Sequence, residues 1–265
     1  MSDLVSAIAS NFIEQPKKIA KGPVRNFTKA FIITILNDHS STVAARKCLQ
    51  SIKNTESYLN PFLIDATTPL NLNQHLSNFN LTLDKWTYPK SPAETKVDLK
   101  SGMKLTGYRA NDYTKVVSCL VSHMRLWRMA IELNETIVVL EHDALFTKKF
   151  HIADIKKAFT GGVLGLNDPI GATRKAALYD KLVKTYANNG ACEVPWIDGK
   201  YIPQGIAGNS AYVITPMAAE QLLNKIEKIG MWPNDAIMCK QFFPWLQQAY
   251  PYYTTVQGTK SSTTL

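Results

Sequence analysis

The chain has 265 residues, enough to bury a sizeable core as one large domain or two small ones. Hydrophobic residues make up 45% and charged residues 19%, a globular balance that argues against intrinsic disorder. Four widely spaced cysteines without a CxxC pair argue against a zinc ribbon or a disulfide framework, and so favour a reducing compartment. The net charge of +9 favours an anionic partner, such as nucleic acid, an anionic lipid surface or a phosphorylated substrate. The alternative is a basic enzyme whose lysines are simply solvated.

Residues 1–29 predict an amphipathic helix followed by a basic connector. This segment lacks the charged start and the long apolar run of a secretion signal. No window approaches the 18 consecutive apolar residues that would span a membrane. We therefore expect a cytoplasmic protein without a transmembrane segment, in the host cytoplasm if the chain is viral.

The next elements follow a strand–helix–strand order. Residues 30–36, "AFIITIL", predict a buried strand, and 42–54 predict a helix capped by Ser41 or Thr42. Residues 61–69 predict a second strand. This order is typical of a parallel α/β sheet, in which ligands bind at the carboxyl ends of the strands.

Residues 70–112 are polar and rich in turns, and their pattern predicts no element. The later segments predict a clear helix at 115–132, strands at 136–140 and 210–215, a strand with its loop at 161–169, and a helix at 216–230. Residues 241–265 form an aromatic-rich tail whose rings could stack on bases or pack on sugars. No repeat or linker is visible, so a single domain over 1–265 is expected.

The stretch "TIVVLEHDALF", residues 136–146, ends a buried strand with two carboxylates, Glu141 and Asp143. Residues two apart on an extended chain point to the same side, so these two could share a ligand. Carboxylate oxygens are ligands for Mg²⁺ or Mn²⁺, which in turn bind phosphate oxygens of a substrate. The pattern therefore predicts a metal site at the tip of this strand.

Two other interpretations of the acid pair stay open. The carboxylates could cap the next turn or pair with Lys148 and Lys149. His142, between them, is expected to face the other side of the strand as a packing or supporting residue.

The stretch "SCLVSHMRLWRMAIELNETIVVLEHDALF" resembles the central block of glycosyltransferase family 25, the lipopolysaccharide-biosynthesis and collagen galactosyltransferase group. That family has a "GCxLSHxxxW" helix followed by a strand and an "EDDA" motif. Downstream, "GIAGNSAYVITPMAAEQLL" resembles the family's "GTxAYxxSxxGAxxLL", and "PNDAIM" resembles its "PxDxxL". The resemblance covers roughly residues 110–240, and the chain could be a member that modifies bacteriophage DNA.

The resemblance implies a GT-A-like (Rossmann-like) α/β fold, with a central mostly parallel sheet flanked by helices. It also implies a nucleotide-sugar donor, most simply a UDP-sugar, and a divalent cation, Mn²⁺ or Mg²⁺. By position, Asp143 would be the main metal ligand and Glu141 the second, while His142 replaces the family's middle acid. No histidine follows His151, so a third protein ligand from the C-terminal part is left open.

An inverting hexosyl or pentosyl transfer needs a base that takes the proton of the acceptor hydroxyl. Asp235, in "WPNDAIM", matches the family's acid and is the candidate base, with Glu141 as a second catalytic residue. The alternative for Asp235 is a helix N-cap, a role that Asn234 could share.

Several polar and glycine residues are candidates for binding the nucleotide-sugar: Asn37, Asp38, Asp65, His123, Gly208 and Asn209. The glycines of "QGIAGNS" would allow close backbone approach to a sugar or phosphate. The alternatives are solvated loop side chains, a plain tight turn at Gly205 and Gly208, and a satisfied core histidine at His123.

A run of basic residues follows the acid motif and is the candidate nucleic-acid surface: Lys148, Lys149, Lys156, Lys157, Arg174 and Lys175. The expected acceptor is a hydroxymethylated base in double-stranded phage DNA, flipped into the site. A lipopolysaccharide core acceptor is the alternative. A catalytically inactive nucleotide-sugar or DNA-binding module and a nuclease are further alternatives, and the sequence does not fix the oligomeric state.

Overall fold

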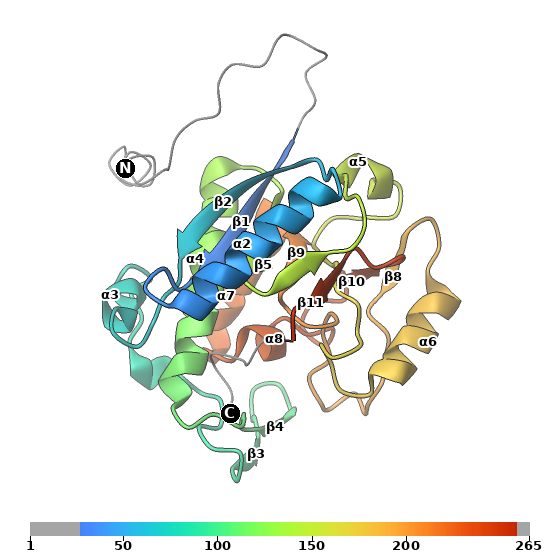
Figure 1. Ribbon diagram of the computed structural model, residues 1–265. Coiled ribbons are helices and arrows are strands. Elements are labelled where there is room, and N and C mark those ends of the chain that lie inside the picture. Colours follow the sequence, from blue (N-terminus) through green and yellow to red (C-terminus); the bar gives the residue numbers. More distant parts are fainter. Residues whose placement is uncertain (1–26, 259–265) are drawn as a thin grey trace.

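The computed structural model describes residues 27–258, so the helix predicted near the N-terminus and the last residues of the aromatic tail lie outside the described part. A seven-stranded sheet forms the centre of the molecule (Figure 1), with the strand order β2-β1-β5-β9-β7-β10-β8. β9 and β8 run antiparallel to the other strands. The expected α/β fold, with a mostly parallel central sheet flanked by helices, is confirmed.

The strands of this sheet are β1 (Thr28–Thr34), β2 (Leu59–Asp65), β5 (Ile137–Glu141), β7 (Val163–Gly165), β8 (Ala191–Glu193), β9 (Ala211–Ile214) and β10 (Gln247–Ala249). The small two-stranded sheets pair β3 (Thr95–Val97) with β4 (Lys104–Thr106), and β6 (Ala144–Phe146) with β11 (Thr254–Val256). The helices are α2 (His39–Asn54), α3 (Leu72–Ser77), α4 (Tyr113–Leu133), α5 (Ile152–Ile155), α6 (Ala176–Tyr186), α7 (Pro216–Ile229) and α8 (Asn234–Ile237), with a 3-10 turn at Leu83–Lys85.

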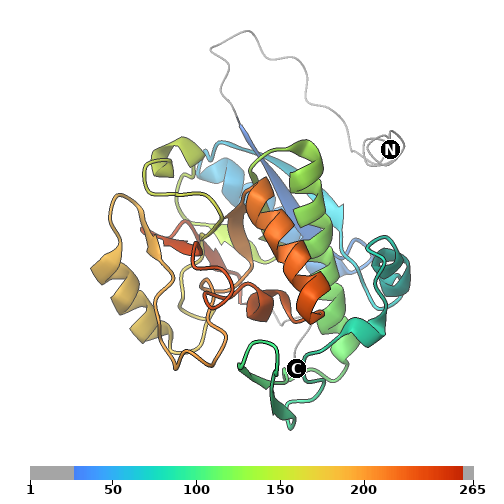
Figure 2. The same ribbon diagram turned by 180° about the vertical axis from the view of Figure 1, so that it is seen from behind.

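Helices cover both faces of the sheet. α2 lies across one face, and α4 and α7 lie side by side across the other (Figures 1 and 2). β1 and β5 are therefore buried on both faces, which explains why they are nearly continuous apolar runs. The two faces are filled by separate apolar clusters, so the sheet is a rigid platform for whatever lies at its edge.

The parallel strands β2, β1 and β5 bring their carboxyl ends to the same edge of the sheet. Ile33 pairs with Glu141, and Thr34 pairs with Asp65. The last residue of β5 is thus level with the end of β1. This edge is where open α/β sheets bind ligands.

Two predicted boundaries were wrong. α2 begins at His39 and is capped by Asp38, whose carboxylate accepts hydrogen bonds from the Ser41 amide (2.7 Å) and the Ser40 hydroxyl (2.6 Å). Asp38 is therefore the N-cap of α2, in place of the predicted Ser41 or Thr42. β2 ends at Asp65, before the Thr/Pro turn that was included in the predicted strand.

Residues 241–258 are not a peripheral tail. β10 lies within the central sheet between β7 and β8, and β11 pairs with β6 directly after the acid motif. Phe243 and Tyr252 are buried, and Tyr253 packs edge-on against Phe150. These three rings pack in or against the core and are not free to stack on bases or sugars. For the partly exposed rings of Phe242, Trp245 and Tyr250 that role stays a prediction.

Candidate active site

A cavity of about 970 Å³ opens at the carboxyl ends of β1 and β5. Its walls also include the first half of α4, the start of α8 and the loop before β9. The predicted site residues that line it are Asp38, His123, Glu141, Asp143, Gly208, Asn209 and Asp235. The fold thus brings together residues that lie almost 200 positions apart in the chain.

The wall of this cavity is acidic although the chain is basic. Asp38, Glu141, Asp143 and Asp235 line it, and Lys115 is the single lysine or arginine among its lining residues in the described part of the chain. Carboxylates that face one cavity repel each other and repel phosphate. A cation or a hydrogen-bonding neutral ligand is the partner that such a wall favours.

Glu141 is held by a line of buried side chains from α4 and β9. The Trp127 indole nitrogen donates to the Tyr212 hydroxyl at 2.8 Å, and that hydroxyl lies 2.8 Å from His123 Nδ1. His123 Nε2 lies 3.2 Å from Glu141 Oε1. Because indole only donates, every group is satisfied when Tyr212 donates to Nδ1 and the Nε2–H donates to Glu141.

This line explains part of the "SHMRLW" motif. His123 and Trp127 are four residues apart on one face of α4, so both reach the same tyrosine. Burial alone would raise the pKa of Glu141, but the hydrogen bond from His123 and the neighbouring imidazoles outweigh it, and the pKa lies below its usual range. Glu141 therefore stays ionised at neutral pH.

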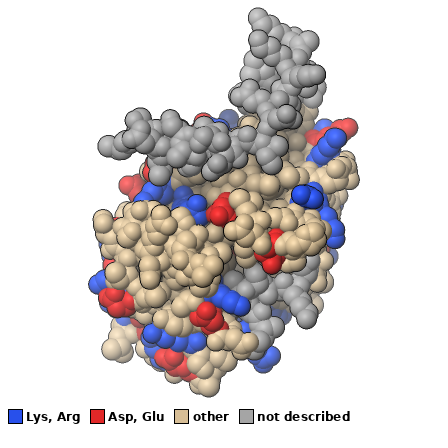
Figure 3. All heavy atoms as spheres, turned by 60° about the vertical axis from the view of Figure 1, so that its left-hand side comes forward, with Lys and Arg blue, Asp and Glu red and all other residues tan. Residues whose placement is uncertain are grey.

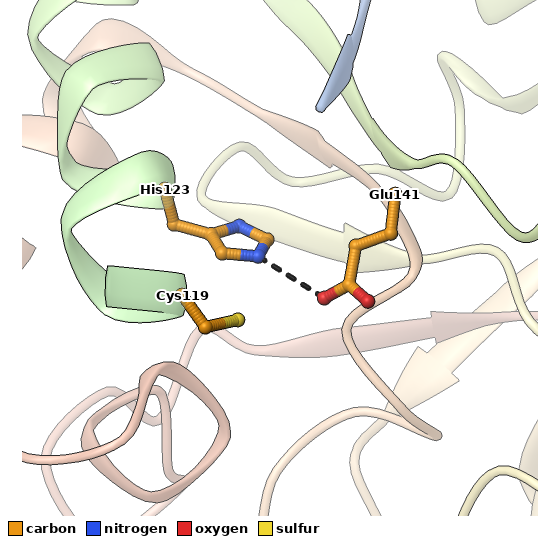
Figure 4. A group of neighbouring side chains, drawn as sticks. All are labelled: Cys119, His123 and Glu141. Carbon is orange, nitrogen blue, oxygen red and sulfur yellow. Dashed lines mark hydrogen bonds and ion pairs between the residues drawn. The ribbon is translucent and has the colours of Figure 1, made fainter. Parts of the chain in front are cut away.

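Cys119, His123 and Glu141 form one cluster at the cavity wall (Figure 4), and their ligand atoms all lie within 4.8 Å of one another. Such a set could hold a metal ion. Each group has a partner within the protein, however, because the Cys119 thiol lies 3.8 Å from Asn234 Oδ1 and His123 bonds Glu141. Burial raises the pKa of Cys119 well above its usual range, helped by the nearby carboxylates, so the thiol is protonated.

Asp143 has the opposite surroundings. Its Oδ1 is buried and has no hydrogen-bond partner among the described residues. Burial raises its pKa to about 7, and the charge of Glu141 adds to the effect. A buried carboxylate oxygen without a partner, next to a second carboxylate, fits a divalent cation, which would supply the missing partner and offset the repulsion.

The acid motif differs from the prediction in one respect. β5 ends at Glu141, and His142 and Asp143 form a turn that leads into β6. Because the chain is no longer extended, His142 also lines the cavity instead of facing away from it. The alternative that the acids pair with nearby lysines was wrong in the described structure, since Lys149 pairs with Glu56 at 3.7 Å.

Asp235 lies across the cavity in the first turn of α8. Its side chain faces the cavity and is exposed there, while protein surrounds it on the other sides. The Tyr108 hydroxyl donates to Asp235 Oδ1 at 2.6 Å. Burial raises the pKa of Asp235, the Tyr108 hydrogen bond lowers it, and the charge of Glu141 raises it, with a net rise. The α8 N-cap is Pro233, so the N-cap alternative for Asp235 was wrong.

The two glycines of the loop before β9 have different roles. A Cβ on Gly205 would lie 2.5 Å from the Met238 carbonyl oxygen, so this glycine permits packing against the segment after α8. Gly208 has φ +69°, a conformation that favours glycine, and it lines the cavity next to Asn209. Of the two glycines only Gly208 lines the cavity, and the close approach of a sugar or phosphate to it stays a prediction.

The other donor-binding candidates lie elsewhere. Neither Asn37 nor Asp65 lines the cavity in residues 27–258. Asp65 Oδ1 accepts a hydrogen bond from the Leu36 amide at 3.2 Å, so its side chain joins the ends of β1 and β2. Asp38 lines the cavity but already caps α2, a structural role that sequence analysis missed.

The six candidate nucleic-acid residues are not on the cavity wall of the described structure. Arg174 and Lys175 both pair with Asp198, at 3.1 and 2.6 Å. On the molecular face in Figure 3, basic and acidic side chains are interspersed. Binding of nucleic acid by this set stays a prediction.

No pattern in the sequence marked Tyr108 or Lys115 as a residue of the site. Tyr108 comes from the segment 70–112, which has no periodicity, and it reaches the cavity because this segment folds over α8. Lys115 stands in the first turn of a helix that was predicted correctly, but a lysine there is usually a solvated residue. Only the fold shows that both face the same cavity as the acid motif.

Residues 64–160 match the family model described as glycosyltransferase family 25 (LPS biosynthesis protein). This segment is similar to glycosyltransferase family 25. It contains α4, the acid motif and the strand between them, and the expected family resemblance is confirmed there. The match supports a glycosyltransferase. A search of curated proteins found no match.

Some solved structures are distantly similar. Mouse xyloside xylosyltransferase 1 in its apo form has a TM-score of 0.40 and 9% identity, with 83% of each chain covered. An active-site mutant of LgtC has a TM-score of 0.36 and 8% identity, covering 81% of this chain and 70% of that chain. The galactosyltransferase LgtC with donor and acceptor sugar analogues has a TM-score of 0.35 and 8% identity, with the same coverage. No helix in the described residues is long and apolar enough to cross a membrane.

Proposed function

We propose that this protein is a divalent-metal-dependent glycosyltransferase that moves a sugar from a nucleotide diphosphate sugar to a hydroxyl acceptor. The observation that carries the proposal is the acidic cavity at the carboxyl ends of β1 and β5. Four carboxylates repel a diphosphate and a single lysine does not offset them, so a bound cation would favour binding of such a donor. The unpartnered oxygen of Asp143 supports this residue as its main ligand, with Glu141 as the second.

When bound, the cation would neutralise the diphosphate that departs from the sugar. The chain's own residues do the rest. The line from Trp127 to His123 holds Glu141 in one orientation, and Lys115 adds a positive charge to the cavity wall. Thus the protein orients the donor with fixed groups, which need no rearrangement during transfer.

Asp235 is proposed as the base of an inverting transfer. The acceptor oxygen forms a bond to the anomeric carbon while the bond from that carbon to the diphosphate breaks. The acceptor proton passes to Asp235, and the electron pair of the broken bond leaves with the diphosphate. A carboxylate whose pKa is raised by burial is a stronger base than a solvated one, which suits this step.

For the acceptor, we propose a hydroxyl of a saccharide such as a lipopolysaccharide core. The description of the matched family supports this class. The acidic wall supports it too, because a neutral hydroxyl near Asp235 is not repelled. The hydroxymethylated base of phage DNA is the second candidate, favoured by the net charge of +9.

Mass spectrometry of reaction products tests the proposal. The protein is mixed with Mn²⁺, a panel of UDP-, GDP- and CMP-sugars, and either lipopolysaccharide core or hydroxymethylated DNA. Transfer of a hexose or pentose to one acceptor, lost in EDTA, is expected. No transfer and no sugar release with any donor would contradict the proposal.

Charge reversal of Lys148, Lys149, Lys156 and Lys157 separates the two acceptors. Because these lysines lie off the cavity wall, transfer to a saccharide is expected to stay unchanged in the fourfold variant. DNA as the acceptor predicts weaker binding and a flatter dependence of affinity on salt.

A further inference from the structure

Asn209 lies in the cavity wall with an unused hydrogen-bond donor. Its side chain is 7% exposed, and its amide nitrogen is buried without a hydrogen-bond partner among the described residues. A buried polar group without a partner is destabilising, so native proteins hold few of them. Such a group in a ligand cavity needs an explanation.

The unpartnered amide cannot be explained by a loosely held loop, because the loop that carries Asn209 is anchored by its neighbours. The next residue, Ser210, accepts a hydrogen bond from the Asn167 side chain, which in turn accepts one from the Thr254 hydroxyl, and all three residues are buried. The Ser210 carbonyl also accepts a hydrogen bond from the Glu141 amide at 2.8 Å. The backbone at Asn209 is therefore anchored to the tip of β5, while its amide nitrogen has no partner.

The residue before Asn209, Gly208, is also packed closely against a neighbouring loop. A Cβ on Gly208 would lie 3.0 Å from Ala172 Cβ, and both residues line the cavity. The wall around Asn209 is thus preformed by two loops in contact. A donor that is fixed in this way is ready to bind a ligand without paying for loop ordering.

The chemistry of the wall selects the ligand group. The amide N–H needs an acceptor, while the nearby carboxylates of Glu141 and Asp143 are acceptors when ionised. A hydroxyl satisfies both, since its oxygen accepts from the amide and its hydrogen is given to a carboxylate. A phosphate oxygen could accept from the amide but has no hydrogen to give to a carboxylate, and in the proposed function the diphosphate would be held by the cation instead.

We propose that Asn209 reads a hydroxyl of the transferred sugar, and so contributes to the choice of sugar. This inference rests on the proposed function, because it requires a nucleotide-sugar in the cavity. It adds a role that is specific to the sugar part of the donor, separate from the nucleotide and the metal. Asn209 touches the substrate in this proposal and takes no part in the proton transfer.

Isothermal titration calorimetry with Mn²⁺ tests the proposal on three proteins: the wild type, Asn209→Leu and the control Asn73→Ala. Asn73 is exposed on α3, away from the cavity wall, so its removal is expected to change nothing. The ligands are the panel of nucleotide-sugars and the matching free nucleotides. Loss of one neutral hydrogen bond should weaken the best-bound nucleotide-sugar about three- to tenfold and leave the free nucleotide unchanged.

A thermal melt of the free proteins separates this role from a structural one. Leucine has no buried donor, so Asn209→Leu should melt at the wild-type temperature or above it. Asn209→Ala is a second variant in case leucine does not fit, and it should show the same loss of sugar-specific affinity.

Three results would overturn the inference: equal affinity of the Asn209 variants and the wild type for the nucleotide-sugar, an equal loss for the free nucleotide, or a lower melting temperature of both variants without a loss in affinity. A wild-type protein that binds no member of the panel would instead overturn the proposed function itself, and the inference with it.

Discussion

The two carboxylates at the end of β5 lie two residues apart but have opposite surroundings. Glu141 ends a line of buried hydrogen bonds that reaches through His123 and Tyr212 to Trp127. Asp143 has a buried oxygen with no partner in the described structure, and its pKa is raised to about 7. Glu141 is thus supported without a ligand, whereas Asp143, like Asn209, has a buried polar atom without a partner among the described residues.

The largest effect is expected for Asp143→Asn. This change keeps the shape of the side chain but removes the proposed main metal ligand, so transfer should fall by roughly 10³-fold. The measurement is the initial rate of transfer with saturating Mn²⁺. Retention of the wild-type rate would contradict a metal role for Asp143.

The same variant makes a prediction about stability. The pKa of Asp143 is raised in the folded protein, so its protonated form favours folding, and that contribution is lost as the pH rises through about 7. Without metal, Asp143→Asn should melt above the wild type at pH 8 and at the same temperature at pH 4. Thermal melts in EDTA at both pH values check this, and equal melting temperatures at pH 8 would show that Asp143 is not destabilised by its surroundings.

The next largest effect is expected for Asp235→Asn, because an amide cannot take the acceptor proton. The kcat should fall by about 10²- to 10⁴-fold, whereas the affinity for the nucleotide-sugar should change little. Steady-state kinetics and calorimetry measure the two quantities. A loss of donor affinity with unchanged kcat would assign Asp235 to donor binding instead.

A smaller effect is expected when the line that holds Glu141 is broken. Tyr212→Phe keeps the ring but removes the hydroxyl that joins Trp127 to His123, and groups that support metal ligands in this way contribute roughly 10- to 100-fold to metal affinity or activity. The Mn²⁺ concentration for half-maximal transfer should rise. Leu133→Met, a conservative change of a partly buried residue at the far end of α4, is the control. An unchanged metal requirement in Tyr212→Phe would show that this line has only a structural role.

The smallest effect is expected for Tyr108→Phe, which removes one hydrogen bond to Asp235. Because that hydrogen bond lowers the pKa of Asp235, its loss should raise the pKa, and the acid limb of the pH–rate profile should move to higher pH. The rate at neutral pH should fall about threefold. Tyr113→Phe, a ring nearby that does not line the cavity, is the control. Identical pH–rate profiles in the two variants would show that Tyr108 does not tune the pKa of Asp235.

The elements that sequence analysis predicted best are those with a strong apolar pattern. β1, β5, α4 and α7 were predicted within a few residues, because burial on both faces leaves a continuous apolar run in a strand and burial on one face leaves a clear periodicity in a helix. The acid motif was found for the same reason, since it directly follows a buried strand. β7 lies within the strand and loop predicted at 161–169, whereas the short strands β8 and β10 carry little pattern of their own and are defined by their neighbours in the sheet.

The parts of the site that the sequence did not reveal depend on long-range contacts. Tyr108 faces Asp235 across 127 positions of the chain, and Tyr212 meets His123 across 89. No local pattern indicates such a pair. Asp65, Phe243 and Tyr252 differ from their predicted roles for another reason. Their residue types suggested ligand binding, but Asp65 joins the ends of two strands and the two rings are buried in the core.

The most direct test of the central claim is the binding of a nucleotide-sugar measured by calorimetry in Mn²⁺ and in EDTA. The wild type should bind one member of the panel only when Mn²⁺ is present, and Asp143→Asn should not bind it under either condition. Equal binding in EDTA, or unchanged Mn²⁺-dependent binding by the variant, would contradict the claim that this acidic cavity holds its donor through a cation at Asp143.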